Sequence, residues 1–306
     1  MSRVVVVKYS ERVDDRPDKD IYRLMLESAL RNLTGEPGPE RGLRSLIPKG
    51  LIGIKTNCIV RRLNSTPVAL TDALTDACVA AGSKPEDIYI WERTNRELKH
   101  AGYELNVGQA GRRCLGTDTK DVGYSREFYS YGKVNSLVSR VLTDIVDYNI
   151  NATVLKDHSL AGLSAAMKNM YGAIHNPNKY HGNNCSPFCA HISNLRPIRS
   201  RNRLHIVDAC RVQYHGGPGF IGDYLTYYGG IIISDDPVAA DTIGLEIIEH
   251  LRKANGMRSL ADDGRPVRYL APAQEAGLGT AERSKIDLVV RVVSADGSEI
   301  KGRLFS

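Results

Sequence analysis

Long apolar runs are missing from this chain of 306 residues. No stretch of about eighteen apolar residues occurs, so no segment is long enough for a transmembrane helix. The opening MSRVVVVKYS indicates a strand and lacks the charged, apolar and small-residue regions of a signal peptide. We therefore expect a soluble chain without membrane insertion, cytoplasmic as given, or periplasmic if a twin-arginine leader was removed.

Cysteine is also scarce, because six residues in a chain of this length do not make a disulfide scaffold. Neither a CxxCxxC ferredoxin module nor a GxxxxGK[ST] phosphate-binding loop occurs. The formal charge is only +6, and lysines and arginines are scattered instead of clustered with aromatic residues. We expect no nucleic-acid binding and a small anionic molecule as partner, with a homo-oligomer left open.

The order of apolar segments is typical of an α/β fold. Continuous apolar runs indicate buried strands at 4–7, 50–56 and 87–91, and helical patterns cover 20–33 and 66–81. These alternations favour a mostly parallel sheet with helices on both faces. The length allows one large sheet or two α/β lobes, 1–133 and 134–306, with most site residues in the second.

The stretch 151–191 concentrates histidine, lysine and cysteine. Its apolar start, 151–155, indicates a strand, and LSAAMKNMYGAI (163–174) indicates a helix. His158 falls between them, where open α/β folds place ligands and chemistry. Lys168 lies among alanines and methionines, where burial lowers a lysine pKa toward values suited to proton transfer or anion binding. The alternative for this pair is a solvated lysine and a structural histidine.

Polar residues follow other predicted strands too, and parallel strands present their carboxyl ends on one edge of a sheet. Catalytic candidates are therefore His158, Lys168, His215 and Asp208. Cofactor-binding candidates are Lys55, Asn57, Asn169, Gly216 and Gly217. The two glycines belong to a turn whose backbone amides can approach an anion closely.

Four residues are candidate metal ligands: Cys58, Cys185, Cys189 and His181. Three thiolates brought together by the fold would hold an iron–sulfur cluster or another transition metal, with His181 or a substrate at the open position. The Cys185-x3-Cys189 spacing is not a standard zinc or ferredoxin signature. The alternative is that these cysteines are small buried residues, and the separation of the Cys58 and Cys185 sulfurs decides between the two.

Five segments together resemble the uncharacterised DUF362 family over nearly the whole chain. They are IKTNCIV (54–60), LKDHSLAGLSAAMKNMYGAIHNPNKYH (155–181), IVDACRVQYHGGPG (206–219), SDDPVAADTIGLEII (234–248) and YLAPAQEAGLG (269–279). Members of that family often carry ferredoxin modules and twin-arginine leaders, neither of which occurs in this sequence. The resemblance therefore implies an architecture more than an activity.

The segment from His158 to Lys168 is also similar to one in nickel-pincer lactate racemases, whose histidine and lysine hold the cofactor. Only these two positions match, and a glycine pair of the racemases is replaced by Ala165-Ala166. Candidates for their other histidines are His175, His181 and His215. The similarity implies a site at His158 and Lys168 and adds a nickel-pincer nucleotide to the cofactors considered.

Three functions remain open from the sequence. The first is a metal- or iron–sulfur-dependent enzyme that acts on a small anionic substrate by proton, hydride or electron transfer in an interlobe cleft. The second is a metal-free isomerase or lyase that uses His158 and Lys168. The third is a ligand- or cofactor-binding protein without turnover. Metal analysis of anaerobically purified protein separates the first from the others.

Overall fold

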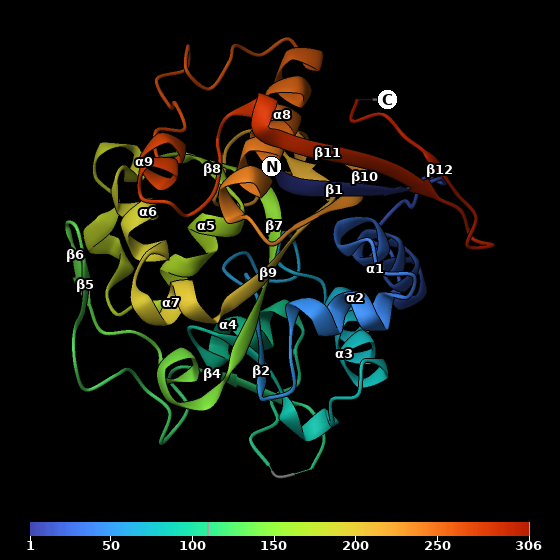
Figure 1. Cartoon of the computed structure of the whole chain (residues 1–306). Helices are drawn as coiled ribbons and strands as arrows, with labels where there is room; N and C mark the ends of the chain where they lie inside the picture. The colour runs from blue at the N-terminus through green and yellow to red at the C-terminus, as the bar shows by residue number, and fades with distance from the viewer. Residues whose placement is uncertain (109, 306) are drawn as a thin grey trace.

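The computed structural model describes residues 1–108 and 110–305 (Figure 1). Its main sheet, counted over these residues, has ten strands. They are β1 (Ser2–Tyr9), β2 (Ile52–Lys55), β3 (Ile88–Glu92), β4 (Arg113–Gly116), β7 (Tyr148–His158), β8 (Gly162–Ser164), β9 (Asn202–Gln213), β10 (Leu225–Ser234), β11 (Ile286–Val293) and β12 (Glu299–Lys301). A separate pair is formed by β5 (Tyr129–Tyr131) and β6 (Val134–Ser136).

The strand order is β12-β11-β1-β10-β9-β7-β2-β3-β4, with β8 paired to β7. Strands β9, β7, β2, β3 and β4 are parallel neighbours, and β1 is parallel to β11. Strand β10 joins the two parallel groups by antiparallel pairing with β1 and β9. The predicted α/β fold with a mostly parallel sheet is confirmed, and the sheet continues across residue 133.

Helices cover both faces of this sheet (Figure 1). They are α1 (Lys19–Thr34), α2 (Pro39–Leu46), α3 (Val68–Ala80), α4 (Asn95–Ala101), α5 (Ala166–Asn169), α6 (Phe188–Ser193), α7 (Arg196–Arg201), α8 (Pro237–Ala254) and α9 (Leu270–Glu275). Single turns are η1 (Pro85–Asp87), η2 (Val141–Ile145), η3 (Met170–Ala173), η4 (Pro177–Tyr180), η5 (Asn183–Cys185), η6 (Gly222–Tyr224) and η7 (Arg283–Lys285). No helix in the described ranges is long and apolar enough to span a bilayer.

The four valines of β1 show why the strand is apolar throughout. Val5 and Val7 belong to a core shared with Leu26 of α1, whereas Val4 and Val6 belong to another shared with Ile243 of α8. Successive side chains of a strand point to opposite faces, so a strand covered on both sides has no polar face. A third core lies around α5, α6 and α9.

The segment around His158 differs from its prediction. Strand β7 is longer than 151–155 and ends at His158, so this histidine lies in a strand and not in a loop. Gly162 adopts a φ of 76°, which favours glycine, and allows β8 to fold back and pair with β7. The predicted helix 163–174 is therefore replaced by β8, the four-residue α5 and the single turn η3.

Candidate functional site

A pocket of about 290 Å³ lies at the carboxyl ends of β2, β3 and β7. These strands are adjacent and parallel, so the residues at their ends meet on one edge of the sheet. Helix α5 closes the pocket from a second side. The polar side chains that line it include Lys55, Asn57, Glu92, Lys156, His158, Ser164, Lys168, Asn169 and His181.

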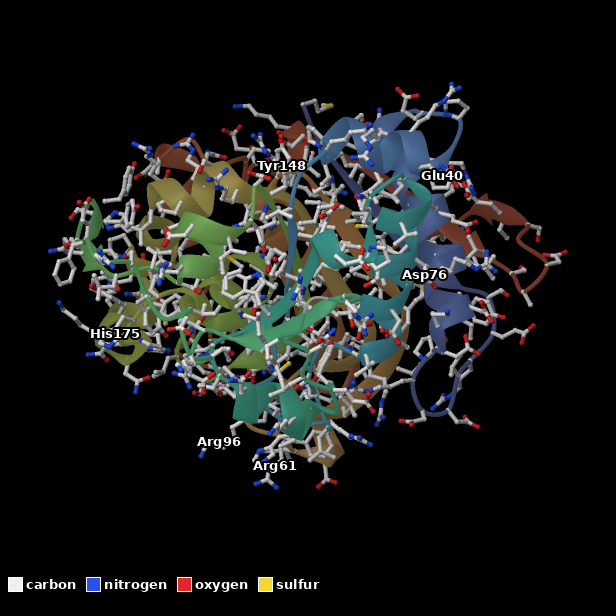
Figure 2. All side chains as sticks on the ribbon, turned by 90° about the horizontal axis from the view of Figure 1, so that it is seen from below. Glu40, Arg61, Asp76, Arg96, Tyr148 and His175 are labelled. Atoms are coloured by element: carbon white, nitrogen blue, oxygen red, sulfur yellow. The ribbon has the colours of Figure 1, made fainter. Side chains whose placement is uncertain are left out.

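The rim is formed partly by the loop after β2 and by the segment leading into α4. Ile59 of the loop and Arg93 before α4 both line the pocket. Arg61 and Arg96, from the same two segments, project from the same side of the molecule in Figure 2. Arg93 is paired with Glu97 at 2.7 Å, so its charge is compensated.

Lys55 and Glu92 form a buried ion pair in the wall of the pocket. Lys55 Nζ lies 2.6 Å from Glu92 Oε1 and also donates to the carbonyl of Thr56. Burial raises the pKa of Glu92, and the Lys55 charge opposes that rise. A Cβ on Gly172 would lie 2.8 Å from Lys55 Nζ, so only glycine lets the backbone pass so close to the pair. Both charges are thus already compensated within the protein.

Lys156 reaches the pocket from the interior of β7 and has uncharged partners only. Its Nζ donates to Asn57 Oδ1 at 3.1 Å and to the carbonyl of Asn64 at 3.2 Å. The side chain is 1% exposed, and burial lowers its pKa from 10.5 to about 7. A neutral amine has two N–H groups, which the two acceptors satisfy, and its lone pair then remains available.

Lys168 faces Lys156 from α5 and contacts aromatic side chains. Its Nζ lies 3.2 Å from His181 Nε2 and 3.6 Å from the centre of the Tyr171 ring. His181 Nδ1 lies 3.0 Å from the carbonyl of Pro177, so Nδ1 carries the proton and Nε2 accepts from the lysine. Burial lowers the pKa of Lys168. A ring face stabilises a cation but does not neutralise it.

His158 carries its proton on Nε2, unlike His181, which carries it on Nδ1. Its Nδ1 accepts hydrogen bonds from the backbone amides of Leu160 and Ala161, at 3.1 and 3.2 Å. Burial, followed by the charge of Lys168, lowers its pKa from 6.5 to about 2. The imidazole is therefore neutral with a proton on Nε2, and it acts as a hydrogen-bond donor and not as a base.

A chain of buried side-chain amides beneath the pocket fixes the orientation of the Asn57 side chain. Asn57 Nδ2 donates to Asn169 Oδ1 at 3.2 Å, and Asn169 Nδ2 donates to Asn151 Oδ1 at 2.8 Å. Asn151 Nδ2 then donates to the carbonyl of Ala166 and contacts His205 Nδ1. Because each amide fixes the orientation of the next, the Asn57 oxygen is directed to Lys156.

Two lysines of the pocket therefore lack a counter-ion. In the described parts of the chain, neither Lys156 nor Lys168 has a carboxylate within 4.0 Å, whereas Lys55 and Arg93 are paired. A buried ammonium group without a counter-ion is costly, and an anionic ligand offsets that cost. The arrangement is suited to a small anion.

Several predicted site residues belong to this pocket. Lys55, Asn57, His158, Lys168, Asn169 and His181 line it. His215 lies beside it instead, 3.2 Å from Arg265, and Gly217 packs so tightly that a Cβ would meet the carbonyl of Asp157. Pro218 lines the pocket, but Gly216 and Gly217 do not, so the turn predicted to bind an anion through its backbone amides does not face the pocket.

Asp208 does not reach the pocket, which corrects its assignment to this site. It lies inside β9, opposite Val154 of β7 and five residues before the strand ends at Gln213, so its side chain packs toward α1 below the strand ends that line the pocket. Its carboxylate accepts a hydrogen bond from the amide of Cys210 at 3.0 Å. Burial raises the pKa of this carboxyl.

The predicted three-cysteine metal site is not formed either. Cys58 packs in the core that includes α1 and α3, whereas Cys185 and Cys189 pack in the core around α5 and α6. All three are free and buried, and burial raises the pKa of each thiol. In residues 1–108 and 110–305, no three histidine, cysteine or acidic side chains are grouped to hold a metal ion. The interpretation as small buried residues describes these cysteines.

Sequence reasoning missed Lys156, Glu92, the main-chain carbonyl of Asn64 and the side-chain amide of Asn151. The signal for Lys156 was present, because NATVLKDH is an apolar strand interrupted by two charged residues. On a strand covered on both faces, a lysine must be buried, and a buried lysine requires a partner. The ring stacking of His158 with His181, 6.0 Å apart, had no such signal.

Comparisons with known proteins place the chain in a family. No curated protein matches the sequence. A crystal structure of a protein from Thermotoga maritima is similar with a TM-score of 0.39 and 12% identity, over 71% of this chain and 58% of that one. The family described as Domain of unknown function (DUF362) matches residues 52–246, which is well over half of the chain and includes β2, β3, β7 and α5. The chain therefore belongs to the DUF362 family.

Proposed function

We propose that this chain is an isomerase or lyase that binds a small organic anion and moves a proton at the carbon beside the anionic group. One observation carries the proposal: Lys156 and Lys168 are buried, line the same pocket, and have no carboxylate partner among the described residues. An anion bound there supplies the missing counter-ion. The two neutral histidines and the amides then provide hydrogen bonds without adding charge.

Each group has a role that follows from its partners. Lys168 binds the anionic group, because its charge is compensated only by a ring face and an imidazole. Lys156 is the base, because a pKa of about 7 leaves a large neutral fraction at neutral pH. His158 donates from Nε2 to the substrate oxygen that gains charge.

The proposed step balances within the site. The C–H bond of the substrate breaks and an N–H bond forms on Lys156, while the electron pair moves to the neighbouring carbonyl oxygen as an enolate. His158 stabilises that oxygen by hydrogen bonding. Return of a proton from Lys156 to the same carbon restores the substrate with a solvent hydrogen, and its delivery to another carbon conjugated with the enolate gives an isomer. In a lyase reaction the enolate electron pair forms a double bond to the next carbon, whose substituent leaves with its bonding electrons and takes the proton from Lys156.

Solvent-deuterium exchange tests this function. Small 2-hydroxy, 2-oxo and phosphorylated acids are incubated with the protein in D₂O, and proton NMR follows loss of the C–H signal. We expect exchange with the wild type and with Lys285→Met, an exposed lysine far from the pocket, and at least about a hundredfold slower exchange with Lys156→Met. Equal rates in the two variants would contradict the role of Lys156.

A second candidate rests on a different observation. His158 and Lys168 line one pocket, and His181 lies 3.2 Å from Lys168. This grouping of an amine with two imidazoles fits the cofactor of the nickel-pincer racemases, which Lys168 and the histidines would hold and which would supply a nickel centre. Stoichiometric nickel in anaerobically purified protein, lost in Lys168→Met, would favour this candidate; iron and sulfide would revive the iron–sulfur hypothesis.

A further inference from the structure

A second cleft, of about 460 Å³, lies on the other side of the loop that follows β2. It is lined by the start of α3, by the segment before α1 and by β9. Three arginines face it, Arg16, Arg62 and Arg211, and Asp15 is the acidic residue in its lining. The cleft shares no residue with the lysine pocket, so its occupant is a separate question from the proposed reaction.

Two of the arginines are held in place by the protein. Arg16 donates to the carbonyls of Ser65 and Leu63, at 3.0 and 2.9 Å. Arg211 extends from β9 and lies 3.0 Å from Asp15, whose side chain is 90% exposed. Since a guanidinium carries five N–H donors, both arginines retain donors for a ligand.

Arg62 completes the cluster and has no partner of its own. It makes no hydrogen bond, ion pair or ring contact with any part of the chain that the structure describes, and Gly102 lies against its guanidinium. Three guanidinium groups face one largely hydrated carboxylate. The planar fork of arginine matches phosphate oxygens in pairs, which makes phosphate a better fit than a small carboxylate.

The remaining wall of the cleft is apolar. Leu63 is 51% exposed there, and the Phe220 ring lines the same wall. An apolar surface beside an arginine cluster suits a ligand that carries a flat ring next to its phosphates. We propose that this cleft binds a phosphate-bearing ligand of the nucleoside diphosphate class, with the diphosphate on the arginines and the base against Phe220.

Residues 63–65 connect the cleft with the lysine pocket. Arg16 holds the carbonyls of Leu63 and Ser65 from the cleft, while Lys156 holds the carbonyl of Asn64 from the pocket. A ligand that draws Arg16 toward its phosphate therefore acts on the segment that positions Lys156. By reciprocity, an anion in the pocket changes the affinity of the cleft by the same factor.

Calorimetric titration of the full chain with pyrophosphate and with ADP tests this site. We expect both probes to bind the wild type, and Arg62→Gln to weaken each by about tenfold, the effect of one charge-assisted hydrogen bond. The matched control is Arg61→Gln, the exposed neighbour that does not line the cleft. Both variants are also compared in the Lys168→Met background, which removes the charge expected to bind phosphate in the other pocket.

Each outcome decides the proposal. Weaker binding with Arg62→Gln but not with Arg61→Gln, in the wild-type and in the Lys168→Met background, supports the cleft as the phosphate site. Tighter binding of ADP than of pyrophosphate, reduced about fivefold by Phe220→Ala, supports the nucleoside class. Unchanged affinity in Arg62→Gln, or no binding of either probe at millimolar concentration, overturns the site, and equal affinity for the two probes overturns the nucleoside assignment. Because Arg62 is exposed and makes no hydrogen bond or ion pair within the described ranges, its replacement does not threaten folding.

Discussion

Lys156 and Asp157 are buried neighbours on β7, but among the described residues only Asp157 has a residue of opposite charge as its partner. Asp157 points to one face of the sheet, and its two carboxylate oxygens accept hydrogen bonds from Arg265 Nη1, at 2.6 and 2.8 Å. Lys156 points to the other face and receives only neutral acceptors. A compensated buried charge holds the structure together, whereas an uncompensated one indicates a place for a ligand.

The largest effect is expected from breaking the ion pair between Asp157 and Arg265. Asp157→Asn removes the buried carboxylate of the Arg265 pair, leaving Arg265 with the more exposed Asp263 at 3.4 Å, and should lower the free energy of unfolding by about 3–5 kcal/mol. Urea denaturation at pH 7 measures it. The control is Asp287→Asn, whose partner Arg3 is well exposed, and whose loss should cost less than about 1 kcal/mol. Similar losses in the two variants would remove the contrast between Asp157 and a surface pair.

Lys156, which lacks a counter-ion in the part of the chain that the structure describes, should make the free energy of unfolding depend on pH. Lys156 titrates near pH 7 when folded and near 10.5 when unfolded, so the unfolded state binds more protons between these values. Stability therefore rises with pH in this window, by about 2 kcal/mol from pH 7 to pH 9, and this rise is missing in Lys156→Met. Denaturation of both proteins at pH 6, 7, 8 and 9 gives the difference. Parallel curves would mean that Lys156 remains charged.

A smaller effect is expected from the second uncompensated lysine. Lys168→Met keeps the length of the side chain and removes its charge, so folding should be largely intact. The affinity for small carboxylates or phosphate in the pocket should fall at least about tenfold in calorimetric titration. Lys285→Met, on the surface beside Glu282, should bind like the wild type. Binding at wild-type strength in Lys168→Met would return this lysine to a structural role.

The smallest effect concerns protons taken up on binding. An anion near Lys156 favours the charged amine and raises its pKa above about 7. Binding at pH 8 should therefore take up a fraction of a proton, since the neutral form of Lys156 that acts as the base stays populated. The uptake is seen when the binding enthalpy changes with the ionisation enthalpy of the buffer. Lys156→Met should bind without this buffer dependence. Uptake that persists in the variant would assign the proton to another group.

Parts of the site could be predicted because they follow from short segments. Lys55 and Asn57 end an apolar run, and Asp236-Pro237 marks the start of α8, where the Asp236 carboxylate accepts the amides of Val238 and Ala239. Lys168 was identified from its alanine and methionine neighbours, and it is buried. In each case the deciding interaction lies within a few residues along the chain.

Other parts depended on where a strand ends and on which core a residue joins. Asp208 follows an apolar run as Lys55 does, but β9 continues to Gln213, so Asp208 lies inside the strand and not at its end. The cysteines at 58 and 185 lie in polar-looking segments and are nevertheless buried in different cores. A shift of one residue along a strand reverses the face, and local sequence does not fix that choice for strands buried on both sides.

Hydrophobic periodicity and strand direction are local properties, so the amino-acid sequence was enough to predict the α/β class, the strand edge where the site lies, and the cluster of lysines and histidines around it. The pairing of charges, in contrast, is visible only in the folded chain. Asp157 meets Arg265 across 108 positions of the chain, and Lys156 meets Asn57 across 99. Contacts of such separation depend on the strand order β9-β7-β2-β3, which brings distant segments together and leaves two lysines facing one pocket.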